Sequence, residues 1–199
     1  MNLRLFFAAF ITNSRVISIT YSNIRDKCGK SRKQLDIDQL KEWIEVHSMK
    51  PDTPDTPYIL AHTIDEADDD CREGQRYFIN ILISSQTLMD TILHDPSAKC
   101  LMIDTTHGLS VDKLLLCLVG TCNKYQEFIP ICLSLTTNEN TRSTAQCLKW
   151  VKERHQGAVM AIRAVMADSA MCLSNAIEAV FGKDEPKPTR QMCNSHMFW

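Results

Sequence analysis

Two aspartates each stand at the end of a short apolar run, a position from which a carboxylate can bind a metal ion. Asp104 follows the run at 99–103, and Asp168 follows the run at 162–167. Apolar runs of this length are typical of buried parallel strands, and open α/β folds bind ligands at the carboxyl ends of such strands. If the two strands are neighbours, the carboxylates meet in one site that suits a hard divalent cation such as Mg²⁺. The alternative is that Asp168 caps the following helix and Asp104 begins a turn.

The segments between and after these aspartates predict the elements that position them. Two apolar runs, 114–119 and 128–135, are joined by a stretch typical of a hairpin connection. Pro130 lies within the second run and has no N–H to donate, so we predict that this run is an edge strand. The elements predicted after it are a helix at 141–156, the strand that ends at Asp168, a helix at 173–181 followed by Gly182, and a strand at 189–193.

The region upstream of the first aspartate predicts a smaller set of elements. Apolar positions at helical spacing predict an amphipathic helix at 36–48. Residues 77–83 have the composition of a strand, and Ser84 or Ser85 is a suitable cap for the helix that follows. Two segments are predicted as loops, namely the proline-rich stretch at 51–57 and the acidic stretch at 65–73.

From about residue 77 onward the chain resembles the transposase domains of Mutator-like elements. The motifs that carry the resemblance occur in the family's order and are LMIDTTH at 101–107, VGTCNK at 119–124, the strand with Pro130, TNENT at 137–141, MADSA at 166–170, NAIEAVFG at 175–182 and MCNSH at 192–196. The resemblance implies a ribonuclease-H-like α/β fold, in which a mixed sheet is flanked by helices and the third strand lies at an edge. It also implies an active site of the DDE type.

The resemblance assigns roles to individual residues. It implies that Asp104 and Asp168 are catalytic carboxylates that bind Mg²⁺ or Mn²⁺ for phosphodiester cleavage and strand transfer. Glu139 matches a position where the family often carries an acid, so it is a possible auxiliary carboxylate. The alternative for Glu139 is an acid favoured near a helix N-terminus. Cys193 and His196 match a Cys-x-x-His element, which we interpret as structural because a zinc site usually needs four ligands.

The function implied by the resemblance is that of a DNA transposase catalytic core, with transposon ends as its DNA partner and the nucleus as its location. The family's catalytic glutamate lies on a helix beyond the Cys-x-x-His element, whereas this sequence ends at Trp199, and Glu178 and Glu185 both precede the last predicted strand. We therefore expect a core truncated at the C-terminus, a fragment that is inactive in isolation. One alternative is a domesticated descendant that binds DNA or protein without catalysis, and another is a different ribonuclease-H-like nuclease.

The composition is that of an intracellular chain with one hydrophobic core. A length of 199 residues with 44% hydrophobic residues is sufficient for such a core. The nine cysteines are odd in number and have no framework spacing, which favours reduced thiols. No apolar run approaches the length of a membrane span, so we expect no membrane partner.

Charge is unevenly distributed, although the formal net charge is only -2. Residues 1–35 are basic, with Asp26 as their one acid and most of the basic residues at 25–33. Such an arm can contact phosphates, and a solvated linker is the alternative. We expect three regions, namely a basic leader or linker at 1–35, an N-terminal helix, acidic loop and strand-helix element at 36–95, and an incomplete ribonuclease-H-like core at 96–199.

Overall fold

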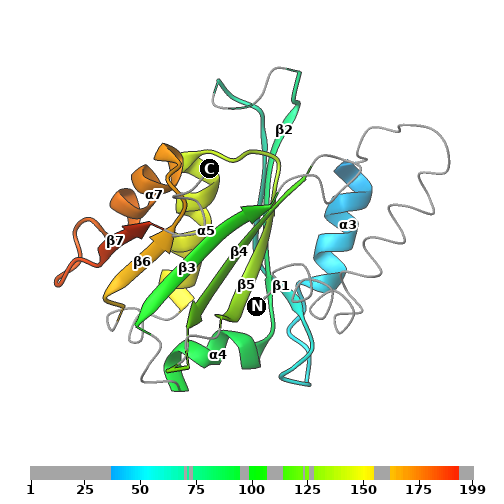
Figure 1. The fold of residues 1–199 in the computed structure, drawn as a ribbon. Helices are drawn as coiled ribbons and strands as arrows, with labels where there is room; N and C mark the ends of the chain where they lie inside the picture. The colour runs from blue at the N-terminus through cyan, green and yellow to red at the C-terminus, as the bar shows by residue number, and fades with distance from the viewer. Residues whose placement is uncertain are drawn as a thin grey trace.

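A mixed β-sheet organises the chain in the computed structural model (Figure 1). The structure describes residues 37–69, 71, 74–94, 99–106, 114–122, 124–125, 128–154 and 162–192. Within these residues the sheet has seven strands in the order β1-β2-β5-β4-β3-β6-β7. The strands are β1 Tyr58–Glu66, β2 Tyr77–Ser84, β3 Cys100–Thr106, β4 Leu115–Cys122, β5 Phe128–Thr136, β6 Ala164–Ala167 and β7 Thr189–Met192.

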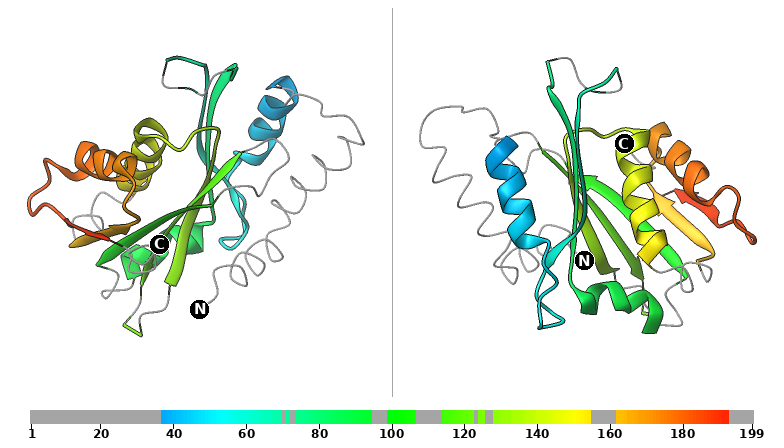
Figure 2. Two further views of the ribbon diagram at one scale, coloured as in Figure 1. Left: turned by 45° about the horizontal axis from the view of Figure 1, so that its top comes forward. Right: turned by 180° about the vertical axis from the view of Figure 1, so that it is seen from behind.

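The sheet changes from antiparallel to parallel pairing at β3. All neighbours from β1 across to β3 are antiparallel, whereas β3, β6 and β7 are parallel. The helices of the described residues are α3 Ile37–His47, α4 Gln86–His94, α5 Thr141–Arg154 and α7 Met171–Phe181. Figure 1 and Figure 2 show α5 and α7 on one face of the sheet, α3 on the other, and α4 at one end. The predicted α/β class, a mixed sheet with flanking helices, is therefore confirmed.

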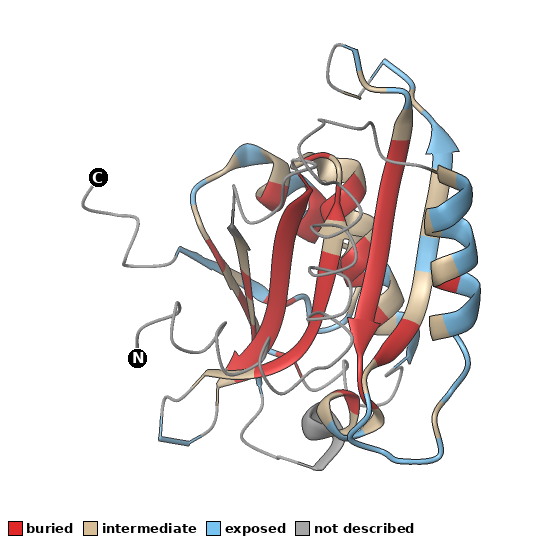
Figure 3. Cartoon of the chain, turned by 90° about the vertical axis from the view of Figure 1, so that its right-hand side faces the viewer, coloured by how far each residue is buried: buried red, intermediate tan, exposed pale blue. Residues whose placement is uncertain are grey.

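Alternating side chains of the central strands divide the core between the two faces of the sheet. Leu118 packs in one cluster with Ile44 of α3, whereas its neighbour Val119 packs in another with Leu148 of α5 and Leu173 of α7. The two-residue period of a strand sends these neighbours to opposite faces. Each fully buried side chain of this size contributes about 1.5–3 kcal/mol to folding. Figure 3 shows the buried central strands and the exposed outer side of α3.

Most of the predicted elements are confirmed. The helices predicted from residues 36, 141 and 173 correspond to α3, α5 and α7, and the last predicted strand corresponds to β7. The predicted hairpin joins β4 to β5 in an antiparallel pair. Ser85 caps α4, since its Oγ accepts a hydrogen bond from the Leu88 N–H at 3.2 Å.

The prediction that the strand with Pro130 lies at an edge is wrong. β5 lies inside the sheet, between β4 and β2. β2 pairs with residues 133–136 of β5, so Pro130 lies outside that ladder and has to fit only the ladder with β4. The β4 ladder is irregular at this point, with a register shift between Val119 and Gly120. A proline is tolerated here because its missing N–H falls where pairing is one-sided and irregular.

The acidic stretch at 65–73 is only partly a loop, because β1 continues to Glu66. Asp65 lies opposite Phe78 in the antiparallel pair of β1 with β2. The sequence pattern does not predict β1, because the strand is buried at Tyr58 and Ile59 and increasingly exposed toward its other end. Its side chains therefore follow neither a continuous apolar run nor a regular alternation.

Several predicted features lie outside the described residues. These are the basic segment at 1–35 and the Cys-x-x-His pair, Cys193 and His196. Their roles stay predictions. In the part of the chain that the structure describes, we find no helix long and apolar enough to cross a membrane.

Candidate functional site

Asp104 lies near the carboxyl end of β3, and Asp168 directly follows its parallel neighbour β6. β3 pairs with β6 so that Leu101 is opposite Val165 and Met102 is opposite Met166. Continuing this register by two residues places Asp104 opposite Asp168, the residue that directly follows β6. Neighbouring strands are about 4.8 Å apart, so we expect the two carboxylates to lie close enough to share one cation. The prediction that the two strands are parallel neighbours is confirmed, and a shared cation between the two carboxylates stays a prediction.

The face on which Asp104 emerges follows from the alternation along β3. Ile103 packs in the cluster with α5 and α7, so the Asp104 side chain points to the opposite face. Its neighbour across the ladder to β4 is Leu118, which belongs to the cluster beneath α3. Asp104 and Asp168 are both half-buried. A half-buried carboxylate remains accessible to a cation and is less screened by water than a fully exposed one.

The turn after β6 holds the Asp168 side chain. Oδ1 of Asp168 accepts a hydrogen bond from the Ala170 N–H at 2.8 Å. This contact is an Asx turn, in which the side chain bonds to the backbone two residues further on. The N-cap of α7 is Ala170, which has no side-chain capping bond. The alternative that Asp168 is itself the cap of the following helix is therefore wrong.

Glu139 lies between β5 and α5, at the end of the sheet where β3 and β5 have their carboxyl ends. Burial raises the pKa of the Cys172 thiol, and the carboxylates of Glu139 and, to a smaller extent, Asp168 raise it further. Both carboxylates are therefore close enough to Cys172 to act on it electrostatically. The N-cap of α5 is Asn140, because its Oδ1 accepts from the Ser143 N–H at 2.9 Å. Glu139 precedes this cap, so a metal-binding role and a role at the helix N-terminus both stay predictions.

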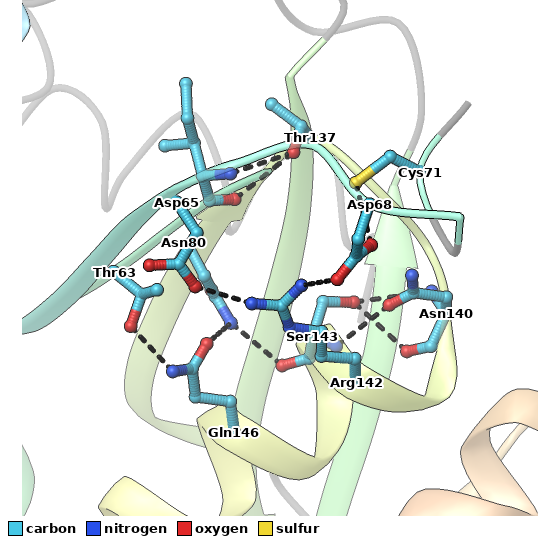
Figure 4. Close-up of polar contacts among 11 residues, drawn as sticks. Thr63, Asp65, Asp68, Cys71, Asn80, Thr137, Asn140, Arg142, Ser143 and Gln146 are labelled. Carbon is cyan, nitrogen blue, oxygen red and sulfur yellow. Dashed lines mark hydrogen bonds and ion pairs between the residues drawn. The ribbon is translucent and has the colours of Figure 1, made fainter. Parts of the chain in front are cut away.

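The connection that carries Glu139 is anchored to β1 and β2 by polar contacts (Figure 4). Thr137 and Ile79 exchange hydrogen bonds, with the Thr137 N–H donating to the Ile79 carbonyl at 3.0 Å and the Ile79 N–H donating to the Thr137 Oγ1 at 3.0 Å. The guanidinium of Arg142 forms ion pairs with Asp65 and Asp68. Asp65 in β1 and Asp68 just after it therefore hold α5 in place, and the start of this helix is fixed from two sides.

A small pocket lined by polar side chains lies near the carboxyl end of β3. Thr105, Asn138 and Glu139 are among its lining residues. Thr105 follows Asp104 in β3, so its side chain points to the opposite face of the sheet. The pocket therefore reaches Glu139 from the α5 side and is not the place where the two aspartates meet.

The other two glutamates considered in the sequence lie away from the aspartates. Glu178 is near the end of α7, where its carboxylate pairs with Lys187 at 2.6 Å. Glu185 is exposed in the turn before β7. The prediction that neither takes the place of a third carboxylate agrees with these positions.

Arg190 is a residue of this site that the sequence analysis missed. Its guanidinium donates hydrogen bonds to the backbone carbonyls of Ala167, at 3.2 Å, and Asp168. The available signal was weak, since it consisted of one basic residue in the last predicted strand, at 189–193.

The donor set fits a magnesium ion in its usual protein environment. Mg²⁺ prefers oxygen ligands, keeps several of its waters and is commonly bound through one or two carboxylates together with substrate phosphates. Asp104 and Asp168 supply two such carboxylates. Over the described ranges there is no group of three or more His, Cys, Asp or Glu side chains that could hold a metal ion. The remaining ligands would then come from water and from a bound phosphate.

Comparison with known protein families agrees with this geometry. Residues 100–198 match the family described as the MULE transposase domain. The match begins at the first residue of β3 and includes Asp104, Glu139 and Asp168. No curated protein matches the chain.

Proposed function

Because residues 100–198 belong to the MULE transposase domain family, we propose that this sheet is the catalytic core of a DNA transposase in which Asp104 and Asp168 bind divalent metal ions. The observation that supports the proposal is the parallel pairing of β3 with β6, which directs the ends of both strands, and with them the two aspartates, to the same end of the sheet. DNA, specifically the transposon ends, is the proposed partner, and the nucleus is the proposed location. The family match supports the assignment of DNA as the partner.

The chemistry proposed for the site is metal-assisted cleavage and transfer of DNA strands. A divalent ion bound there supplies Lewis-acid stabilisation of the negative charge that develops on the reacting phosphate. Mg²⁺ is the proposed ion, and Mn²⁺ takes the same oxygen ligands. The two aspartates supply the negative charge that attracts the ion to the end of the sheet, and the Asx turn to Ala170 orients one of them.

Glu139 is proposed as an auxiliary carboxylate of the same site. Its electrostatic effect on Cys172, which it shares with Asp168, supports a position at the same edge. Asn140 already caps α5, so the helix has a cap without Glu139. We expect the substitution Glu139→Gln to weaken metal binding less than the loss of either aspartate does.

A second candidate function is that of a non-catalytic DNA- or protein-binding descendant of a transposase. The observation that favours it is that the described residues contain no group of three or more His, Cys, Asp or Glu side chains that could hold a metal ion. In this case the fold is retained, but metal binding at Asp104 and Asp168 is dispensable for binding DNA or protein.

The experiment that separates these functions is a Mn²⁺ titration of the 199-residue chain followed by electron paramagnetic resonance. Asp104→Asn and Asp168→Asn should each reduce Mn²⁺ affinity at least tenfold, which is about 1.4 kcal/mol of binding free energy. Asp52→Asn is the matched control, because Asp52 is an exposed acid in the segment between α3 and β1. Equal Mn²⁺ binding by all four proteins would contradict the proposed metal site and favour the second candidate.

Cleavage is tested on supercoiled plasmid DNA with Mg²⁺ or Mn²⁺. We expect the isolated chain to give only background nicking, because metal-assisted phosphoryl transfer depends on a complete set of ligands. Nicking by the wild-type chain that Asp104→Asn abolishes would show that two aspartates are sufficient, and would contradict the predicted inactivity in isolation.

A further inference from the structure

Arg190 connects β7 to the end of β6 through its guanidinium group. Nη1 donates to the carbonyl of Ala167 at 3.2 Å, and Nη2 donates to the carbonyl of Asp168. Nη1 also donates to the carbonyl of Gln191 on the strand of Arg190 itself. The two carbonyls on the β6 side belong to the last residue of the strand and to the candidate metal ligand that follows it.

The register of the sheet explains how this side chain reaches the Asp168 turn. Arg190 lies opposite Val165 in the parallel pair of β7 with β6. An extended arginine side chain spans the distance from this position to the carboxyl end of the neighbouring strand. The Asp168 carbonyl lies beyond the last residue of β6, and Arg190 supplies a donor for it. A buried carbonyl without a donor would cost free energy, so this contact stabilises the turn.

The contact needs a planar, forked donor. The guanidinium offers Nη1 and Nη2 in a fixed geometry that matches two successive carbonyls, whereas a lysine ammonium is a point charge on a flexible stem. The Arg190 Nε atom is buried and has no hydrogen-bond partner among the residues described. A guanidinium that is partly removed from water makes stronger hydrogen bonds with the groups that it does contact.

We propose that Arg190 is a positioning residue for Asp168. Arg190 holds the end of β6, so that the Asp168 carboxylate stays opposite Asp104. The inference rests on the proposed metal site. Two contacts act on the same turn, because Arg190 fixes the Asp168 backbone while the Ala170 N–H fixes the side chain. The residue therefore acts through Asp168.

Charge and position predict opposite effects of Arg190 on metal binding, which makes the proposal testable. A cation beside the aspartates repels a divalent ion, so if Arg190 acted only through its charge, its removal would tighten metal binding. If Arg190 positions Asp168, its removal weakens metal binding. Loss of a residue that orients a metal ligand typically reduces affinity about 10- to 100-fold.

The experiment compares Arg190→Met, Arg190→Lys and the wild type in the full 199-residue chain. Mn²⁺ affinity is measured by electron paramagnetic resonance, and hydrogen exchange of the Ala170 amide is measured by NMR in the absence of metal. We expect both variants to bind Mn²⁺ about tenfold more weakly and to exchange the Ala170 amide several-fold faster. Lys187→Met is the matched control, because it removes a cation that pairs with Glu178 in the segment before β7.

The outcomes separate the positioning role from its alternatives. Tighter Mn²⁺ binding by Arg190→Met, or wild-type behaviour of Arg190→Lys in both measurements, overturns the proposal. If Arg190→Met fails to fold, the lysine variant decides. If the wild-type chain binds no Mn²⁺, the proposed metal site fails, and the Ala170 exchange rates alone decide whether Arg190 holds the Asp168 turn.

Discussion

Replacing Asp104 by asparagine is expected to stabilise the metal-free protein. The register of β3 and β6, continued by two residues, brings Asp104 and Asp168 to the same end of the sheet, so we expect their negative charges to repel each other when no cation is bound. Asparagine has nearly the same shape and keeps one carbonyl oxygen as an acceptor. The substitution therefore removes the repulsion with little change in packing.

The size of this repulsion follows from the strand spacing. Two unit charges about 5 Å apart repel each other by about 0.8 kcal/mol in water and by about 3 kcal/mol at an effective dielectric constant of about 20. Both side chains are half-buried at the rim of the sheet, so the repulsion should lie toward the lower of these values. We expect Asp104→Asn to raise the free energy of unfolding by about 1 kcal/mol without metal.

Divalent metal should cancel this advantage. Binding to the folded state alone stabilises a protein by RT ln(1 + [L]/Kd), which is about 1 kcal/mol at 5 mM Mg²⁺ for a site with a Kd of about 1 mM. The wild type gains this term and Asp104→Asn does not. The stability difference between the two proteins should therefore shrink to near zero as Mg²⁺ is raised.

Urea unfolding of the full chain, followed by circular dichroism with EDTA and with increasing Mg²⁺, measures both effects. Asp52→Asn is the control for a general change in net charge, because it removes one exposed acid away from the sheet. Its stability should respond to Mg²⁺ as the wild type does. A loss of stability in Asp104→Asn under EDTA, or an equal Mg²⁺ response of wild type and Asp104→Asn, would refute the reasoning.

Two further predictions concern cysteine ionisation. Because Glu139 raises the pKa of the Cys172 thiol more than Asp168 does, Glu139→Gln should lower that pKa more than Asp168→Asn, as measured by the pH profile of Cys172 alkylation with peptide mass spectrometry. The reverse order would contradict the assigned placement of Glu139. A hydrogen bond with Cys147 and burial hold the pKa of Cys117 in the folded chain well above its ordinary value of 9.0. Above pH 9.0 the Cys117 thiol therefore loses its proton in the unfolded chain but keeps it in the folded chain, so the unfolded chain binds fewer protons. The free energy of unfolding should therefore fall as pH rises above about 9, by up to about 1.4 kcal/mol per pH unit for this thiol. It should fall less steeply in Cys117→Ala, and urea unfolding of both proteins at pH 8.5 and 10.5 measures the difference.

Elements with a complete local pattern could be predicted from the sequence. The apolar run before Asp104 and the helical spacing of Leu173, Ile177 and Phe181 are sufficient, because these residues are buried on one side in the same way along the whole element. β1 could not be predicted, since its burial changes along its length and depends on pairing with a strand that follows it in the chain.

The place of β5 in the sheet shows where a correct local argument gives a wrong global conclusion. Pro130 does lie outside the ladder with β2. The prediction nevertheless failed, because β2 pairs with residues 133–136 and leaves the proline end of the strand out of that pairing. A proline therefore constrains the part of a strand around it, and the position of the whole strand depends on partners that a local pattern does not show.

Arg190 could not be assigned from the sequence for a related reason. Its contacts with Ala167 and Asp168 depend on the parallel pairing of β7 with β6 and on a side chain that runs along the neighbouring strand. Contacts of this kind join residues more than twenty positions apart. No spacing in the sequence marks them.

The alternation of β3 is what presents a carboxylate at the metal-binding face rather than in the core. Leu101 and Ile103 are buried in the cluster with α5 and α7, and Met102 and Asp104 occupy the opposite face. A shift of β3 by one residue would exchange the two faces and bury the charge of Asp104. Burying a charge in an apolar core costs far more than the loss of a few apolar contacts, so the position of the aspartate also helps to fix the register. The residue proposed to bind the metal and the apolar residues beside it therefore select the same pairing of β3 with β6.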